Sequence, residues 1–262
     1  MKVAILAGGK GTRIDPSETG LPKPLVPIGG HSLLWHVMQI YRGFGHGDFV
    51  IALGHLGEEI VRHFLSAPEF ATAALTSPDG GTRDPRPGSG SWHIRLVDTG
   101  PDTLSAGRIR RLRPFLAEET FMLTWCDGLA DIDIAALAAF HAGHGKTATV
   151  TAVHPPPRFG RLEIDGERVT RFEEKGVLTG EWINGAFFVL EPDVFDAVPL
   201  PDDLAFETAP LQRLSATGEL MAYRHDSFWR CVDMERERRE LDRLWEAGTA
   251  PWKTWGEGEE CA

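Results

Sequence analysis

The chain has 262 residues, of which 42% are hydrophobic and 25% charged, so its length and composition suit one large α/β domain over 1–262. Its formal charge of −11 argues against binding to nucleic acid or to an acidic membrane surface, because a polyanion is repelled at long range. No apolar stretch approaches the ~18 residues of a membrane span and no signal segment is recognisable, so we expect a cytoplasmic protein.

The first element is an apolar strand that ends in glycine. Val3–Ala7 is expected as a strand, and it breaks at once into the glycine-rich segment 8–13. Glycines let backbone N–H groups approach a polyphosphate, because no Cβ intervenes and φ can be positive. A glycine-rich segment after a strand is often only a tight turn that binds no phosphate. This segment fits neither the dinucleotide-binding nor the Walker pattern. Lys10, Arg13 and, further on, the proline-flanked Lys23 supply positive charge beside it.

Strands and helices alternate along the rest of the chain, which indicates a doubly wound α/β fold. Strands are expected at 49–53, 94–97, 121–125, 148–153, 162–164, 169–172, 182–190 and 220–225. Helices are expected at 33–44, 56–65, 133–141 and 235–246. Residues 66–92 are expected to be a variable loop insertion, because 77–91 is dominated by glycine, proline, serine and charged residues. Residues 235–262 form the expected C-terminal helix and tail.

Two aspartates follow apolar runs. Phe121–Trp125 leads directly into Cys126 and Asp127, which places a carboxylate at the carboxyl end of a strand, where ligands of open α/β sheets bind. Asp233 follows a second apolar run and is expected to meet Asp127. Two carboxylates, phosphate oxygens and water make the oxygen-rich shell that Mg²⁺ prefers. By itself, Asp-Gly after a strand is more commonly a turn.

Together these motifs resemble the sugar-phosphate nucleotidyltransferase family. Its first loop reads Gly-Gly-x-Gly-Thr-Arg followed by Pro-Lys-Pro-Leu-x-Pro, and residues 8–13 and 22–27 match it. Further matches to its glucose-1-phosphate cytidylyltransferase branch run along the whole chain, at 28–30, 34–36, 97–100, 156, 158–160, 183–185, 228–229 and 250–255. The resemblance implies a Rossmann-like nucleotidyltransferase fold with a mixed, mostly parallel central sheet flanked by helices. It also implies Mg²⁺-dependent transfer of a cytidylyl group from CTP to a sugar 1-phosphate, with glucose 1-phosphate as the expected acceptor.

The same resemblance implies the roles of individual residues. Arg13 and Lys23 are expected to be catalytic, and Asp127 and Asp233 to hold the metal. The expected nucleotide-binding residues are Leu6, Ala7, Gly8, Gly9, Gly11, Thr12, Arg13, Lys23, Gly107, Arg108, Arg111 and Asp127. The expected sugar-phosphate-binding residues are Glu174, Lys175, Asn184 and Gly185. Without the resemblance, the charges at 173–175 are typical of a solvated turn, and the two arginines after Gly107 are as readily solvent-facing.

Some positions depart from the family pattern. Cys126 stands where relatives have glycine, Gly176 replaces a proline, Ala186 replaces a glycine, and Ser105 and Ala106 replace Thr-Gly. Relatives in the cytidylyl branch carry an insertion near 77–91 that crosses to a neighbouring subunit, which implies a homo-oligomer. Two alternatives stay open: an enzyme that uses UTP, dTTP, GTP or another sugar 1-phosphate, and a non-catalytic nucleotide-binding regulatory subunit.

Overall fold

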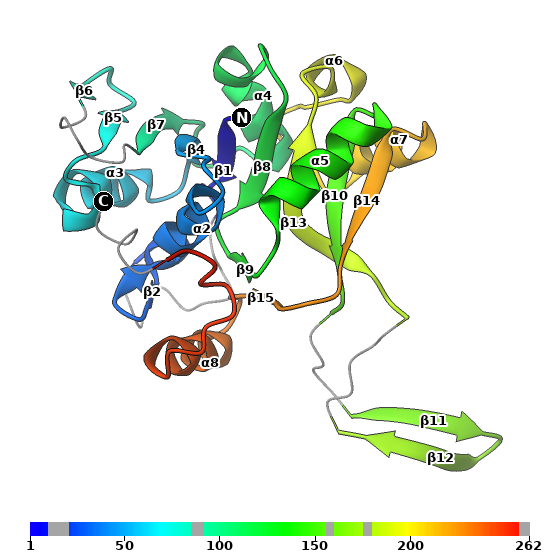
Figure 1. Cartoon of the computed structure of the whole chain (residues 1–262). Helices are drawn as coiled ribbons and strands as arrows, with labels where there is room; N and C mark the ends of the chain where they lie inside the picture. Colours follow the sequence, from blue (N-terminus) through cyan, green and yellow to red (C-terminus); the bar gives the residue numbers. More distant parts are fainter. Residues whose placement is uncertain (10–20, 85–91, 156–159, 175–179, 257–262) are drawn as a thin grey trace.

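Figure 1 shows a computed structural model of the chain, which describes residues 1–9, 21–84, 92–155, 160–174 and 180–256. Its centre is a nine-stranded sheet. From edge to edge the strands are β14 (Leu220–His225), β10 (Ala148–Val153), β13 (Ile183–Leu190), β8 (Phe121–Trp125), β1 (Val3–Leu6), β4 (Asp48–Leu53), β7 (His93–Asp98), β5 (Ala74–Thr76) and β6 (Thr82–Arg83). β13 is antiparallel to β10 and β8, whereas β8, β1, β4, β7 and β5 run parallel to one another. The expected mixed, mostly parallel sheet is confirmed.

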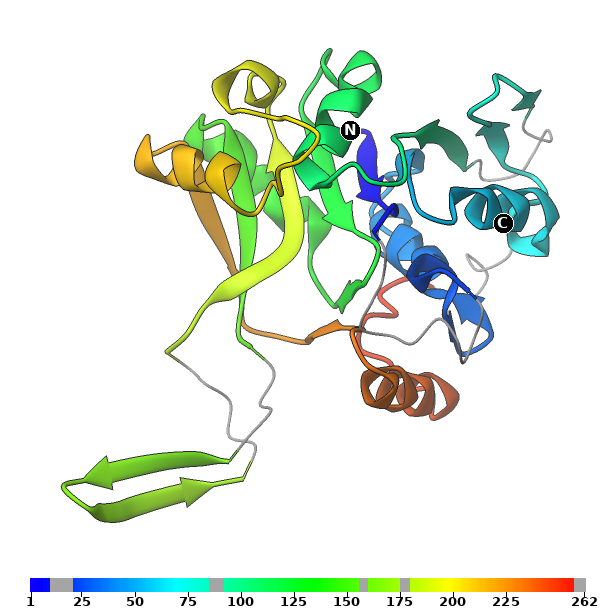
Figure 2. The same cartoon turned by 180° about the vertical axis from the view of Figure 1, so that it is seen from behind.

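Helices cover both faces of the sheet (Figures 1 and 2). The helices are α2 (Leu33–Arg42), α3 (Gly57–Ser66), α4 (Ser105–Leu116), α5 (Ile134–His144), α6 (Val194–Ala197), α7 (Ala209–Ala216) and α8 (Glu235–Glu246). Because side chains alternate along a strand, Val3 and Ile5 of β1 join the core under α2, α3 and α5, and Ala4 and Leu6 join the core under α4, α6 and α7. None of the helices in the described residues is long and apolar enough to cross a membrane.

Three helices and the character of one segment differ from the expectations, because no helix was expected at α4, α6 or α7. The stretch of α4 carries Pro114 and four arginines between 108 and 113, so its apolar residues do not stand out as a helical pattern. The expected loop insertion at 66–92 adds the short helix η2 (Pro68–Phe70) and the edge strands β5 and β6, within its described part. The assignment of 1–262 to one domain stays a prediction.

Short pairings connect the sheet to the C-terminal segment. β9 (Gly128–Ala130) follows β8 and pairs antiparallel with β15 (Trp229–Cys231), which precedes α8. Near the N-terminus, the 3-10 helix η1 (Lys23–Leu25) leads into the small hairpin of β2 (Pro27–Ile28) and β3 (His31–Ser32). The pairing of β9 with β15 brings segments far apart in the chain together beyond the carboxyl end of β8.

A second hairpin stands away from the main body (Figures 1 and 2). It consists of β11 (Arg161–Asp165) and β12 (Arg168–Glu173). Leu162 lies opposite Phe172, and Ile164 lies opposite Val169, so these four apolar side chains share one face. Leu162 is 49% exposed and Phe172 is 62% exposed. The hairpin therefore presents an apolar face that remains about half exposed or more within the described part of the chain.

The C-terminal tail packs onto α2 through tryptophans. Trp245 and Trp252 lie within aromatic contact of His36, at ring-centroid distances of 4.7 and 6.0 Å. The His36 ring is fully buried. The Trp252 indole donates to His36 Nδ1 (3.3 Å), so His36 Nε2 carries the proton that is donated to the carbonyl of Ile28 (2.8 Å). Both contacts are those of a neutral imidazole.

This buried imidazole predicts acid sensitivity. Burial lowers the pKa of His36 to about 3, against an ordinary value near 6.5. A depressed pKa stabilises the fold fully above the unfolded value and loses that stability as the pH falls toward the folded value, by ~1.4 kcal/mol per pH unit. We expect the free energy of unfolding, measured with urea at pH 7.5, 6.0 and 5.0, to fall more steeply in the wild type than in His36→Gln. Equal slopes would contradict the assignment.

Candidate active site

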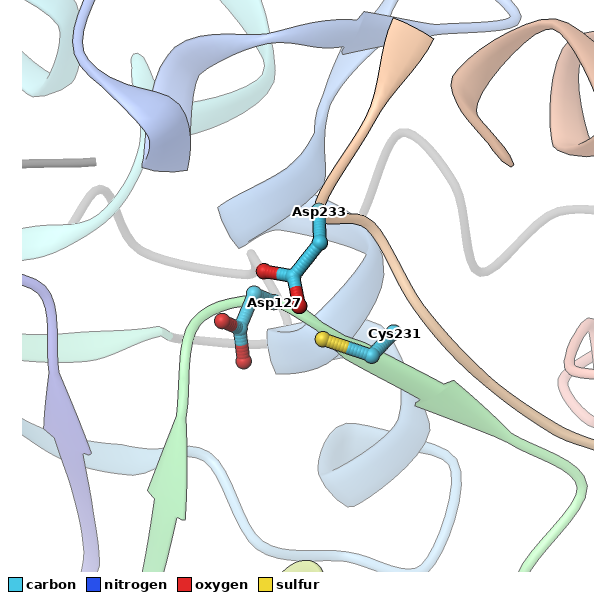
Figure 3. Close-up of side chains that lie close together, drawn as sticks. All are labelled: Asp127, Cys231 and Asp233. Carbon is cyan, nitrogen blue, oxygen red and sulfur yellow. The ribbon is translucent and has the colours of Figure 1, made fainter. Parts of the chain in front are cut away.

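Three side chains from distant parts of the chain meet at one end of the central strands. The Lys23 ammonium lies 2.7 Å from Asp127 Oδ2 and 2.7 Å from Asp233 Oδ1. The three side chains are only 12%, 23% and 17% exposed, respectively. Figure 3 shows Asp127 and Asp233 turned toward each other, with Cys231 beside them. The structure therefore brings together the two predicted metal ligands and one predicted catalytic residue.

Local structure fixes both carboxylates. Asp127 stands in the tight connection between β8 and β9, and its carbonyl accepts from the Val232 amide (2.9 Å), continuing the pairing of β9 with β15. Asp233 comes directly after this pairing. Glu237 of α8 accepts hydrogen bonds from the backbone amides of Asp233 (2.7 Å) and Met234 (3.0 Å). The start of α8 thus holds Asp233 in register with Asp127.

The electrostatics suit a cation. Burial by itself lowers the pKa of Lys23, but the charge of Asp127 and hydrogen bonds to both carboxylates outweigh it, so the pKa lies above its usual range. Two carboxylates facing one ammonium leave a net negative charge in the cluster. Paired carboxylate oxygens are the donors that Mg²⁺ takes in proteins, usually together with phosphate oxygens and water. The residues present therefore fit a hard divalent cation.

Two thiols lie close to the carboxylates. Ligand atoms of Asp127, Cys231 and Asp233 all lie within 4.8 Å of one another. Burial, followed by the charge of Asp127, raises the pKa of the Cys126 thiol to about 12 and raises that of Cys231 as well. Thiolates are soft ligands, whereas Mg²⁺ selects oxygen. Cys231 reaches this cluster because the pairing of β9 with β15 sets it opposite Gly128, the residue after Asp127.

The glycine segment after β1 is described as far as Gly9. Leu6 and Ala7 are buried, and the Ala7 amide donates to the carbonyl of Ala52 (3.0 Å), which extends the pairing of β1 with β4. Gly9 is exposed. The predicted site residues Gly11, Thr12 and Arg13, together with Lys10, lie outside the described residues.

Arg108 and Arg111 of α4 differ in burial and in their hydrogen-bond partners. Arg108 is 4% exposed and donates to the carbonyl of Gly8 (2.8 Å), among other oxygens. Arg111 is 38% exposed, donates to the carbonyl of Thr99 (2.9 Å) and pairs with Asp202 (2.7 Å). Gly107 packs so closely on Asp202 that a Cβ would lie 2.6 Å from its Cα. That these three residues bind nucleotide stays a prediction, and the contacts of Arg108 are with the protein itself.

The predicted sugar-phosphate side is described in part. Glu174 and Asn184 are exposed, and Asn184 Oδ1 accepts from the Ala186 amide (2.8 Å). The Gly185 carbonyl accepts from the Trp229 indole (2.8 Å), which ties the start of β13 to β15, two residues before Cys231. Lys175 lies outside the described residues, as does Gly176. The hydrogen bond from Trp229 places Gly185 near the carboxylate cluster.

Ala186 adopts a backbone conformation that favours glycine. Its φ is +65°, in the left-handed region. A residue with a Cβ costs roughly 1 kcal/mol or more there, and relatives of the resembled family carry glycine at this position. The neighbouring Gly185 has no room for a side chain, because a Cβ would lie 2.7 Å from Val153 Cγ1. The departure at Ala186 therefore stores strain beside the predicted sugar pocket.

Several solved structures share this fold. HddC from Yersinia pseudotuberculosis superimposes with a TM-score of 0.68 at 19% identity, covering 93% of this chain and 99% of that one. The inositol-1-phosphate CTP transferase from T. maritima gives a TM-score of 0.62 at 17% identity, covering 95% and 97%. At such low identities the likeness shows the fold alone. The chain is thus a Rossmann-like α/β protein with a mixed central sheet.

The family follows from sequence comparison. The model of the Nucleotidyl transferase family matches residues 2–234, and the chain belongs to that family. The glucose-1-phosphate cytidylyltransferase of Salmonella typhi is 41% identical over 97% of this chain and 100% of its own length. A probable glucose-1-phosphate cytidylyltransferase of Bacillus subtilis is 39% identical, again over 97% of this chain and 100% of its own length. The resemblance seen in the motifs is confirmed.

Proposed function

We propose that this chain transfers the cytidylyl group of CTP to a sugar 1-phosphate, with glucose 1-phosphate as the acceptor, and releases pyrophosphate. The full-length similarity to glucose-1-phosphate cytidylyltransferases supports this substrate pair. The observation that carries the proposal is the contact of Lys23 with both Asp127 and Asp233 at 2.7 Å, because it places paired acids and a cationic group together at the end of the sheet. Such a cluster argues for catalysis over a regulatory nucleotide-binding role.

The proposed chemistry is an in-line displacement at phosphorus. An oxygen of the sugar 1-phosphate attacks the α-phosphorus of CTP, the new P–O bond forms, and the bond to pyrophosphate breaks. The nucleophile is already an anion near neutral pH, since the second phosphate pKa is about 6, so no general base is required. Catalysis then depends on positioning and charge neutralisation.

Each residue has a proposed part in that displacement. Lys23 and Arg13 would neutralise the triphosphate and the leaving pyrophosphate, and Lys175 would orient the attacking phosphate. Glu174 and Asn184 would hold sugar or ribose hydroxyls. Asp127 and Asp233 would hold Mg²⁺, which neutralises phosphate charge when bound.

The test is a substrate panel. We expect kcat/KM with glucose 1-phosphate and Mg²⁺, measured by pyrophosphate release, to be highest for CTP among CTP, UTP, dTTP and GTP. Cytosine presents an amino donor where uracil has a carbonyl, so a site offering acceptors leaves them unpaired toward uracil, at roughly 1–3 kcal/mol each, or about tenfold to a hundredfold in rate. A clear preference for UTP or dTTP with any accepted sugar would overturn the cytidylyl assignment.

We also propose that the chain works as a homo-oligomer in the cytoplasm. The apolar face of the hairpin β11–β12 supports association, because a two-stranded ribbon is marginal alone and homo-oligomers are the commonest assemblies. Leu162→Glu with Phe172→Glu is expected to lower the molar mass measured by sedimentation. Glu163→Lys, on the opposite face of the ribbon, serves as the control. An unchanged mass in the double variant would contradict the role of this face.

A further inference from the structure

Arg108 occupies a closed position under the strand ends. Its guanidinium donates to the carbonyl of Leu53 at the end of β4 (2.8 Å) and to Thr99 Oγ1 (2.6 Å) and the carbonyl of Gly100 (3.0 Å) just after β7. A fourth hydrogen bond goes to the carbonyl of Gly8, after β1 (2.8 Å). One side chain thus joins the segments that follow three neighbouring parallel strands.

Two glycines make room for this guanidinium. A Cβ on Gly8 would lie 2.2 Å from Arg108 Nη1, and a Cβ on Gly54 would lie 2.3 Å from the same atom. Neither position can carry a side chain while Arg108 keeps its place. The glycines at the ends of β1 and β4 therefore accommodate a protein group, in addition to any approach of a phosphate to the loop.

Peptide geometry carries the effect of Arg108 to the open side of the loop. The carbonyl of Gly8 and the amide of Gly9 belong to one trans peptide, in which C=O and N–H point in opposite directions. The Gly8 carbonyl is turned inward by Arg108 and by the His55 amide (3.2 Å). The Gly9 N–H therefore points away from Arg108, and a Cβ on Gly9 would meet no atom of the described residues within 4 Å.

We propose that Arg108 is a positioning residue, which fixes the Gly8–Gly9 peptide so that the Gly9 N–H faces the triphosphate of the nucleotide. It acts through the backbone, because its own donors are used inside the protein and its side chain is 4% exposed. This inference rests on the proposed function, in that it takes the bound group to be a nucleoside triphosphate. It assigns Arg108 a different role from direct contact with the nucleotide.

The experiment measures binding of inorganic triphosphate and of glucose 1-phosphate by calorimetry. We expect Arg108→Met to weaken triphosphate binding about tenfold or more, the usual consequence of losing a charged hydrogen-bond donor. Arg108→Lys is expected to lose most of that affinity as well, because an ammonium keeps the charge but lacks the planar fork that reaches several oxygens. Glucose 1-phosphate affinity is expected to stay unchanged. Arg110→Met removes the same charge from an exposed position of α4, and is expected to bind triphosphate as the wild type does.

A double-mutant cycle covers the case in which Arg108→Met does not fold. Gly54→Ala displaces the guanidinium without removing it, so we expect weaker triphosphate binding in the wild-type background and no further loss in the Arg108→Lys background. Gly143→Ala is the matched control, because a Cβ there would meet no atom of the described residues within 4 Å.

Triphosphate affinity equal to wild type in Arg108→Lys and Gly54→Ala, or an equal loss for both ligands, would overturn the positioning role. The proposed function fails separately, if the wild type binds triphosphate but releases no pyrophosphate from CTP and a sugar 1-phosphate.

Discussion

Asp127→Asn and Asp233→Asn are each expected to abolish turnover while leaving the fold intact. Removing one carboxylate charge weakens the hold on the metal, which supplies several kcal/mol of charge stabilisation to the transition state, so kcat is expected to fall on the order of 10³-fold or more. The fold should survive, because Lys23 keeps one of its two partners at 2.7 Å. The measurement is pyrophosphate release at saturating substrates, together with thermal unfolding.

The matched control is Asp133→Asn. Asp133 caps α5 by accepting from the Ala136 amide (2.8 Å), and asparagine caps helices equally well, so this variant should retain both activity and stability. Turnover like that of the wild type in either Asp127→Asn or Asp233→Asn, at ordinary Mg²⁺ concentration, would remove the metal assignment.

Lys23→Met is expected to have two opposite effects. The kcat/KM for CTP should fall on the order of 10²-fold, the usual consequence of losing a preorganised charge contact with the transition state. Binding of Mn²⁺ to the nucleotide-free protein should instead become tighter, because the ammonium that lies 2.7 Å from both carboxylates no longer competes with the metal. Activity assays and calorimetry read the two effects independently.

Lys146→Met is the control for loss of a lysine charge, since Lys146 pairs with Glu219 at the surface. If Lys23→Met changed only the KM for the sugar phosphate, Lys23 would belong to the other substrate.

The protonation of Lys23 should not contribute to the pH profile of activity near neutrality. A raised lysine pKa stabilises the fold fully below the unfolded value near 10.5, and that contribution is lost only as the pH rises through the folded value.

The position of one of the two paired acids was predictable from a local signal. Asp127 follows a strand that is apolar apart from Thr124, and open sheets bind their ligands at the carboxyl ends of parallel strands, so one carboxylate could be placed without the tertiary structure. The bounds expected for β8, β10, β14 and α8 are also confirmed. Such patterns are set by short-range alternation of apolar residues, which any stable version of the fold must bury.

Long-range packing decided the rest. Lys23 contacts acids 104 and 210 residues away, and the pairing of β9 with β15 that aligns those acids has no local signal in the sequence. The sequence did not predict the inward orientation of Arg108 either, because a helical arginine next to glycine is typical of a side chain that faces solvent or a ligand. Its direction is set by the space left beneath Gly8 and Gly54, and by four oxygens contributed from three strand ends.

Sequence by itself determined the fold class, the family and the type of chemistry, since these depend on local pattern and motif. The tertiary structure decided which charged side chains face one another and which face inward, because burial of a charge depends on partners that only the assembled sheet brings within reach.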